Sequence, residues 1–322
     1  MRKWRSLIGA VALGMSVIGT LPANAQQSIA IFTGTSPIFG PVFVADAKGY
    51  FREEGINVTV KAFTSGADAS EGFRSGGAQF LIASDVPLIY QMVGGDAVLL
   101  GQFSQNDDML IMMGHKSINS PADLKGKKVG LVRKSGSEYM LKRYLEKGNL
   151  SLTDVEMINI PPFEQVPAMA NGDIVAVSTW KPFNLKILGV SKDTKLLSEN
   201  GPVGYRLYSG ILTKRSLATP ENRKLMISVM RALHKGAMWL DKAPADEKFT
   251  LIAGQVKTSA GDVKEVIQNN KWSMVIDNNF KSAITNIASY MSEQGLITKN
   301  LDWEKSVDFS YLAELDPSFV SK

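Results

Sequence analysis

The chain has 322 residues, of which 44% are hydrophobic and 21% are charged, an ordinary balance for a folded globular protein. This length suits two medium-sized domains, and the composition excludes a disordered chain. The absence of cysteine excludes disulfide bonds, thiolate metal sites and a lipid anchor on an N-terminal cysteine. Only two histidines are present, His115 and His234, and they lie far apart in the chain. We therefore expect neither a metal site nor another cofactor.

Residues 1–25 have the pattern of a cleavable secretory signal peptide. Arg2, Lys3 and Arg5 precede an apolar run over residues 7–21, and Ala-Asn-Ala at 23–25 matches a small-residue cleavage site. The alternative is a membrane anchor, but the run is shorter than the ~20 residues of a bilayer-spanning helix. We expect the mature protein to lie in the periplasm, without a lipid anchor.

The charge of the mature chain is modest. Cleavage removes three basic residues and no acidic ones, so Lys plus Arg falls from 36 to 33 against 31 acidic residues. The net charge thus falls from +5 to +2, which gives no support for nucleic-acid binding. Neither a phosphate-binding loop nor a dinucleotide-binding glycine motif occurs in the sequence.

The mature chain begins with alternating strands and helices. Apolar runs predict the strands, and helical periodicity with polar turns predicts the helices between them. In chain order we expect strand 28–33, helix 39–51, strand 56–63, helix 69–75, strand 78–83, helix 88–93 and strands 98–103 and 109–113. Such short connections favour one parallel sheet with its covering helices.

A second α/β unit follows between Pro121 and Phe183. Its expected elements are strand 128–132, helix 137–147, strand 156–160, helix 163–171, strand 174–178 and a helix beginning at Trp180. A short strand at 195–197 and an extended segment at 205–213 then lead back to the first unit. From Pro220 onward the pattern predicts helix after helix, at 221–243, 245–256, 260–268 and 280–294, which would cover the sheet of the first unit.

Polar corners follow the predicted strands, each just before a helix. They comprise residues 34–36, 65–67, 84–85, 135–138 and 179–180. Many such residues only cap a helix. In parallel sheets, however, these corners share one edge, where helix N–H groups bind anions. One helix N-terminus contributes at most about 2 kcal/mol, whereas micromolar binding needs about 8 kcal/mol. Micromolar binding therefore requires several corners from both units to converge on the ligand, and it also requires burial of the ligand's surface.

Aromatic residues near the corners offer that burial. They are Phe39, Phe43, Trp180, Phe183, Tyr205 and Tyr208. Each is more often part of a core than a ligand contact, and Trp180 is the strongest candidate because it directly follows a strand end. His115, just past a predicted strand, is a weaker candidate, whereas His234 lies at helical spacing where packing explains it.

Three stretches of the chain resemble one family. They are PVFVADAKGYFREEGINVTV at 41–60, DLKGKKVGLVRKSGSEYML at 123–141 and NGDIVAVSTWKPF at 171–183. The sequence resembles, over residues 29–217, the substrate-binding proteins of ABC importers for nitrate, sulfonate, taurine and thiamine precursors, a family that shares a domain with fungal pyrimidine synthases. These motifs specify a fold better than they specify a ligand.

The resemblance implies a two-lobed α/β fold of the periplasmic-binding-protein type II class. Each lobe would hold a mainly parallel sheet flanked by helices, and two crossover strands near 109–115 and 207–213 would form the hinge. Lobe 1 would comprise residues 26–112 and 209–322, and lobe 2 residues 113–208. The ligand would bind in the cleft between the lobes.

By position, the family's pocket maps to the polar corners, and we add one aromatic residue of the returning segment. The expected ligand-binding residues are Thr35, Ser36, Ser65, Gly66, Ser84, Asp85, Ser135, Gly136, Trp180 and Tyr205. The sequence departs from the family at Lys181, where members often carry an acid between Trp and Pro. Together with Arg133 and Lys134, this lysine favours an anionic ligand.

We therefore expect a monomeric periplasmic receptor that captures a small anionic or aromatic solute, such as a sulfonate, nitrate, taurine or a pyrimidine, and delivers it to an inner-membrane permease. No reaction and no catalytic residue is expected, because the synthases rely on cysteine- and histidine-bearing motifs that this chain lacks. One alternative is an exported enzyme that uses the same cleft with His115 or a carboxylate. Another is a sensor module that presents its closed form to a receptor kinase.

Overall fold

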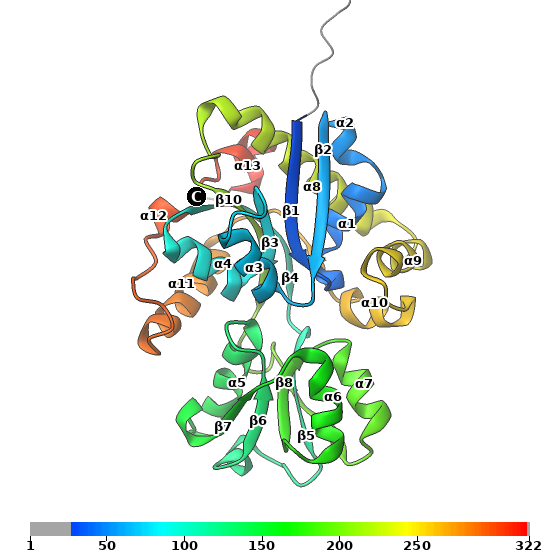
Figure 1. Ribbon diagram of the computed structural model, residues 1–322, viewed down its shortest axis with the longest axis vertical. Helices are drawn as coiled ribbons and strands as arrows, with labels where there is room; N and C mark the ends of the chain where they lie inside the picture. Colours follow the sequence, from blue (N-terminus) through cyan, green and yellow to red (C-terminus); the bar gives the residue numbers. More distant parts are fainter. Residues whose placement is uncertain (1–26, 321–322) are drawn as a thin grey trace, which may run out of the picture.

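The computed structural model describes residues 27–320, which fold into two α/β lobes, one above the other in Figure 1. The predicted signal peptide lies outside the described residues. Within residues 27–320, no helix combines the length and the apolar composition that crossing a membrane requires.

The first lobe is built on a six-stranded sheet in the order β11-β4-β10-β3-β1-β2. The strands are β1 (Gln27–Gly34), β2 (Ile56–Phe63), β3 (Phe80–Ser84), β4 (Ala97–Asn106), β10 (Leu207–Lys214) and β11 (Lys271–Trp272). β1 pairs in parallel with β2 and β3, whereas β10 lies between β3 and β4 and is antiparallel to both. The expectation of one wholly parallel sheet from the first part of the chain was therefore wrong, because a strand from far along the sequence inserts into it.

Helices cover this sheet on both faces (Figure 1). On one side lie α1 (Gly40–Ala47), α2 (Tyr50–Glu53), α8 (Arg223–Lys242), α9 (Ala245–Val256) and α10 (Ala260–Ile267). On the other side lie α3 (Gly66–Arg74), α4 (Asp85–Gly94) and α11 (Asn278–Glu293), and α12 (Trp303–Ser306) and α13 (Ser310–Leu315) complete the lobe. The helical tail packs on the first lobe as predicted. The single predicted helix 39–51 is broken because Gly49 adopts a left-handed φ of 78°.

The second lobe holds a five-stranded sheet in the order β7-β6-β8-β5-β9. The strands are β5 (Leu110–His115), β6 (Lys128–Leu131), β7 (Glu156–Asn159), β8 (Ala176–Trp180) and β9 (Thr194–Glu199). The helices are α5 (Gly136–Glu146), α6 (Pro162–Asn171) and α7 (Phe183–Val190). Trp180 ends β8 and the next helix begins only at Phe183, so the helix start predicted at Trp180 was wrong.

Two short segments connect the lobes. They run between β4 and β5, at residues 107–109, and between β9 and β10, at residues 200–206. All of β5 pairs within the second sheet, so residues 110–112 lie with lobe 2 and not with lobe 1. Likewise β10 begins at Leu207, which places residues 207 and 208 in the first sheet. The crossovers are thus loops between strands, and the strands themselves belong to one lobe each.

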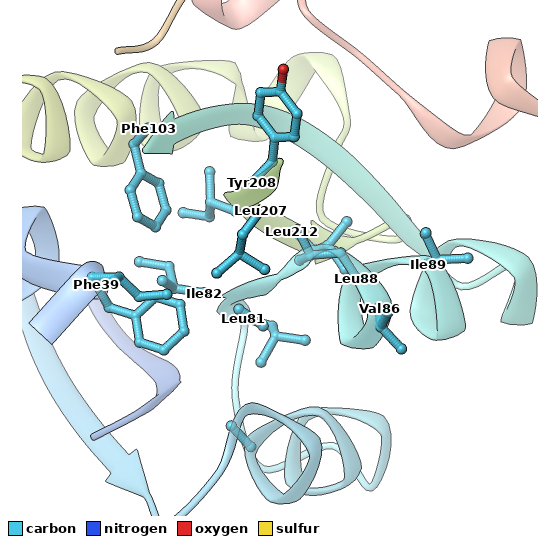
Figure 2. Packing of buried hydrophobic residues seen from close by; sticks show 14 of the residues in the cluster. Phe39, Leu81, Ile82, Val86, Leu88, Ile89, Phe103, Leu207, Tyr208 and Leu212 are labelled. Carbon is cyan, nitrogen blue, oxygen red and sulfur yellow. The ribbon is translucent and has the colours of Figure 1, made fainter. Parts of the chain in front are cut away.

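The main apolar core lies between the sheet of the first lobe and its helices (Figure 2) and continues into the second lobe between β6 and α5. Phe39, Leu81, Leu88 and Phe103 come from four different elements and are at most 3% exposed. Burying a side chain of this kind contributes roughly 1.5–3 kcal/mol. In the second lobe, a smaller cluster fills the space under α6 and α7; its members are Ile111, Met113, Met169, Ile174, Val177 and Ile187.

The close contact of α1 and α8 requires a residue without a side chain. A Cβ atom at Gly236 of α8 would lie 2.3 Å from the carbonyl oxygen of Pro41 in α1, so the two backbones would have to separate. We predict that Gly236→Ala lowers the free energy of unfolding by roughly 1–3 kcal/mol, the usual cost of overpacking. Urea unfolding followed by circular dichroism measures this change.

Gly254 of α9 provides the matched control, because no atom lies within 4 Å of the Cβ that alanine would add there. Alanine has the better helix propensity, so Gly254→Ala should leave stability unchanged or raise it by up to about 1 kcal/mol. Equal unfolding midpoints for the two variants would contradict the close-contact explanation.

Candidate ligand-binding site

A cavity of about 170 Å³ lies between the two lobes. Many of the residues that line it come from the carboxyl ends of β1, β3 and β8 and from the first turns of α3 and α5, and others come from α6, α7 and the end of α9. Leu110 and Leu207, the first residues of the antiparallel strands β5 and β10, line it as well. The volume is below the ~300–1,000 Å³ of pockets for drug-sized ligands, so the cavity suits a small solute.

Eight of the ten predicted residues line this cavity. They are Thr35, Ser36, Ser65, Gly66 and Ser84 from the first lobe, and Ser135, Gly136 and Trp180 from the second. The strand ends thus converge as the sequence predicts, although the binding of a ligand to these residues stays a prediction.

The serine side chains at the helix starts are already engaged with the protein. Ser65 accepts a hydrogen bond from the backbone N–H of Asp68 at 3.1 Å, and Ser135 accepts one from that of Ser137 at 3.2 Å. The first N–H groups of a helix have no partner within the helix, which leaves those of Gly66 and Gly136 at the cavity. Ser36 and Ser84 are different: the buried hydroxyl of Ser36 has no hydrogen-bond partner among the described residues, and the side chain of Ser84 caps no N–H group of α4. The groups at the cavity that are not engaged with the described residues are therefore mainly backbone N–H groups and these two hydroxyls.

Asp85 and Tyr205, the other two predicted residues, lie behind the cavity wall. Asp85 is 0% exposed and Tyr205 2%. The Tyr205 hydroxyl donates to Oδ1 of Asp85 at 2.8 Å, and its ring packs edge-on against Tyr139 of α5 at 4.8 Å between centroids. The pair therefore connects the second crossover to both lobes. Sequence cannot reveal this, because a polar residue after a strand can point into the cavity or back into the protein.

The buried carboxyl of Asp85 should make stability depend on pH. Burial raises the pKa of Asp85 from 3.8 to about 7, against the opposing effect of its hydrogen bonds with Tyr205 and Val86. Between these pKa values the folded state binds more protons than the unfolded state, so stability falls as pH rises.

We predict that Asp85→Asn, whose amide does not titrate, gains stability relative to the unmodified protein as the pH rises from about 4 to about 7. Urea unfolding at several pH values measures the difference between the two proteins. A difference that stays constant with pH would contradict the raised pKa.

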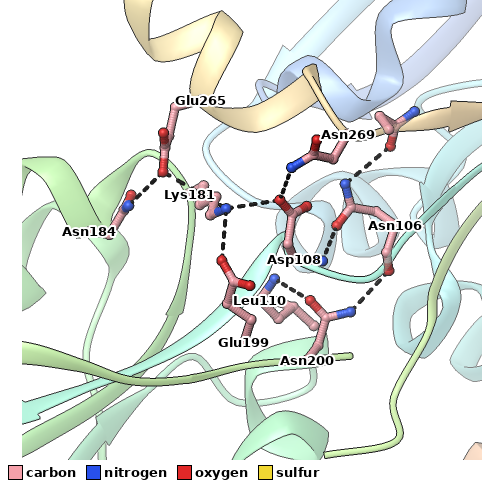
Figure 3. A network of polar contacts seen from close by, with 10 residues as sticks. Asn106, Asp108, Leu110, Lys181, Asn184, Glu199, Asn200, Glu265 and Asn269 are labelled. Carbon is pink, nitrogen blue, oxygen red and sulfur yellow. Dashed lines mark hydrogen bonds and ion pairs between the residues drawn. The ribbon is translucent and has the colours of Figure 1, made fainter. Parts of the chain in front are cut away.

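Lys181, expected to favour an anion, is instead surrounded by carboxylates (Figure 3). Its side chain is 7% exposed, and Nζ lies 3.0 Å from Asp108, 3.1 Å from Glu199 and 3.8 Å from Glu265. Burial alone would lower the pKa of Lys181, but the hydrogen bonds with Asp108 and Glu199 outweigh it and raise the pKa. The positive charge of Lys181 is therefore compensated within the protein.

The same network joins the lobes. Glu265 belongs to α10 of the first lobe and also accepts a hydrogen bond from Asn184 of α7 at 2.8 Å. Asn269, just past α10, donates to Asp108 of the first crossover at 2.8 Å. Figure 3 shows these side chains reaching from both lobes toward Lys181 and Asp108. Polar contacts thus hold α10 against the second lobe beside the cavity.

We predict that Lys181→Met destabilises the protein by on the order of 3 kcal/mol, because it leaves three carboxylates facing each other without a counter-charge. Thermal unfolding measures the loss, and adding Glu265→Gln to Lys181→Met should restore part of it. The control is Lys192→Met, because Lys192 is exposed and has no ion pair within residues 27–320. Equal losses for the two lysine variants would contradict this account.

The other cations expected to favour an anion do not line the cavity. Nη1 of Arg133 lies 2.9 Å from Glu138, and the backbone N–H of Lys134 donates to the same carboxylate. The lysines that line the cavity without a carboxylate partner in the described chain are Lys186 and Lys257. Neither lysine was expected at the cavity. Lys186 lies inside helix α7, past the predicted corner, and Lys257 lies in the helical tail, which reaches the cavity only through folding.

Neither histidine lies at the cavity. His115 is exposed at the far end of β5 and contacts Ser117, with 2.8 Å between its Nδ1 and the hydroxyl oxygen. His234 on α8 packs against Phe319, and burial lowers the pKa of His234. Among the described residues, no group of His, Cys, Asp and Glu is arranged to hold a metal ion.

Two curated relatives match most of the chain. A putative aliphatic sulfonates-binding protein of Bacillus subtilis is 24% identical over 296 residues, which cover 89% of this chain and 88% of the relative. The taurine-binding periplasmic protein of Escherichia coli is 24% identical over 279 residues, which cover 80% of this chain and 84% of the relative.

Solved structures share the fold. The alkanesulfonate-binding protein SsuA of Xanthomonas axonopodis pv. citri, bound to MOPS, superposes with a TM-score of 0.75 at 19% identity and covers 87% of this chain and 98% of its own. The desulfurization enzyme DSZB superposes with a TM-score of 0.65 at 14% identity and covers 88% of this chain and 98% of its own. The expected two-lobed fold is confirmed, and this fold serves an enzyme as well as binding proteins.

A family model described as NMT1/THI5 like matches residues 36–247, about two thirds of the sequence, and includes most of the residues that line the cavity. With relatives named as sulfonate- and taurine-binding proteins, this confirms the resemblance found in the sequence. The chain belongs to the NMT1/THI5-like family.

Proposed function

We propose that this chain is the periplasmic solute-binding component of an ABC importer. As a monomer, it would close its lobes on a small anionic or aromatic organic solute and deliver the solute to a permease in the inner membrane. The observation that carries the proposal is the cavity itself, which both lobes and both antiparallel strands line. A solute there would contact both lobes and thereby favour the closed arrangement over an open one.

The chemistry of the lining supports a solute of this kind. Two helix starts from opposite lobes, at Gly66 and Gly136, present N–H groups to the cavity, and Lys186 and Lys257 add positive charge. Oxyanions bind favourably at such helix starts. Trp180, Met109 and several other apolar residues provide the buried contact that helix N-termini alone cannot supply.

We include no reaction in the proposal. Among the described residues that line the cavity there is neither a histidine nor a carboxylate, the groups on which the enzyme alternative depends. The two relatives reported above are named as binding proteins, whereas the likeness to the enzyme DSZB is one of fold. Mass spectrometry of a bound solute before and after incubation with the mature protein distinguishes binding from turnover, because only turnover changes the mass of the solute.

A thermal-shift screen of sulfonates, nitrate, pyrimidines and aromatic acids tests the proposal. A ligand at 100 times its dissociation constant adds about 2.7 kcal/mol to stability, which raises the melting temperature by a few degrees. We predict that Trp180→Ala weakens binding of each hit at least about tenfold, because it removes an aromatic contact. His115→Ala, at the far end of β5, should bind like the unmodified protein.

Trp180→Phe keeps a ring at this position and should retain most of the affinity. If no compound raised the melting temperature, the receptor proposal would fail. Unchanged affinity in Trp180→Ala would instead remove Trp180 from the site and leave the receptor proposal standing.

A further inference from the structure

We propose that the cavity takes an organic anion with an apolar, ring-shaped body and rejects solutes that carry an ammonium group, and that Phe163 selects the ring. This inference rests on the proposed function and narrows it to one class of solute. Three features of the cavity carry it: the charges of its lining, an exposed aromatic wall and its volume.

The lining charges exclude an ammonium group. Lys181, Lys186 and Lys257 line the cavity, whereas none of the described lining residues is an aspartate or a glutamate. The carboxylates around Lys181 are committed to the charge of that lysine. An ammonium group entering the cavity would lose its hydration, find no carboxylate among the described lining residues, and lie near positive charges. A zwitterion therefore binds worse than an anion of the same shape.

An aromatic wall belongs to the second lobe. Phe163 of α6 packs edge-on against Phe183 of α7, with ring centroids 5.2 Å apart, and Phe183 packs edge-on against Trp180 at 6.1 Å. All three rings line the cavity, yet Phe183 is 7% exposed and Phe163 is 61% exposed. The interior of the protein therefore covers Phe183 and leaves most of the Phe163 side chain exposed.

That uncovered ring is suited to contact a solute. Nζ of Lys186 lies 5.6 Å from the centroid of Phe163 and 5.7 Å from that of Phe183. From the first lobe, Val256 contributes an apolar side chain to the same cavity. A solute with a flat ring and a negative head group can stack on Phe163 while its charge is attracted to Lys186. An alkyl chain of the same charge covers less of the Phe163 ring.

The volume agrees with one ring. Apolar cavities of about 150 Å³ accommodate a benzene molecule, and this cavity measures about 170 Å³. It leaves little room for a second ring without movement of the lobes. We therefore expect a single-ring anion to be the best fit.

Isothermal titration calorimetry of the mature chain with matched probes tests the proposal. Propane-1-sulfonate and taurine differ only by a methyl group in place of an ammonium group, and benzenesulfonate adds the ring. We expect propane-1-sulfonate to bind at least tenfold more tightly than taurine, and benzenesulfonate at least fivefold more tightly than propane-1-sulfonate. Benzoate repeats the ring comparison with a carboxylate head group.

Phe163→Ala should weaken benzenesulfonate about tenfold and propane-1-sulfonate less than threefold. The exposed ring of Phe163 contributes little to the core, so the melting temperature of the Phe163→Ala variant should stay close to that of the unmodified protein. The control is Leu188→Ala on α7, because Leu188 is 43% exposed and does not line the cavity.

Taurine binding as tightly as propane-1-sulfonate would overturn the exclusion of ammonium groups. Equal weakening of both sulfonates by Phe163→Ala, or no weakening of benzenesulfonate, would overturn the role of Phe163. In either case a bound anion leaves the receptor function intact. If none of the four probes bound the folded protein while the thermal-shift screen found another ligand, this inference would be overturned and the receptor function would stand. The receptor function would fail only if that screen found no ligand at all.

Discussion

The architecture depends on one constraint of strand direction. Within each lobe, the parallel strands end at the edge that faces the other lobe, and the chain can cross to the other lobe only from that edge. In each lobe, the strand next to a crossover starts at this edge and runs antiparallel to both of its neighbours, β5 in one lobe and β10 in the other. The cavity and both crossovers consequently share the same edge.

The joint between the lobes differs from one region to another. Tyr139 of α5 packs against Tyr205 of the second crossover and against Tyr290 of α11, which gives one region a buried aromatic contact. In another region, the contact consists of the charged network around Lys181. Between the lobes lies the cavity. The interface between the lobes therefore combines buried aromatic side chains, which contribute through the area that they bury, with ion pairs that require a defined geometry.

Lys181 shows why the charge of a single residue is a poor guide to a ligand. Its place next to Trp180 suggests a cation that faces an anionic solute, and it does line the cavity. A buried charge, however, requires a partner, and Asp108, Glu199 and Glu265 supply one from inside the protein. The positive charge left for a solute comes from Lys186 and Lys257, whose positions in helix and turn give no such signal.

Much of the fold could be predicted from the sequence. The strand β2 and the helix α9 have the predicted bounds, and most other elements differ by a few residues, because apolar periodicity and turn residues are local signals. The insertion of β10 between β3 and β4 could not be predicted in this way, because the pairing joins segments far apart in the chain.

For the site, local sequence patterns indicated which corners follow strand ends, and eight of the ten predicted ligand-binding residues line the cavity. The folded structure was needed to show that Asp85 and Tyr205 pair behind the wall, that Lys181 is neutralised, and that Phe163 and Lys257 belong to the lining. Backbone direction follows from local patterns. The direction of a side chain and the partner of a charge depend on neighbours that the fold brings from elsewhere in the chain.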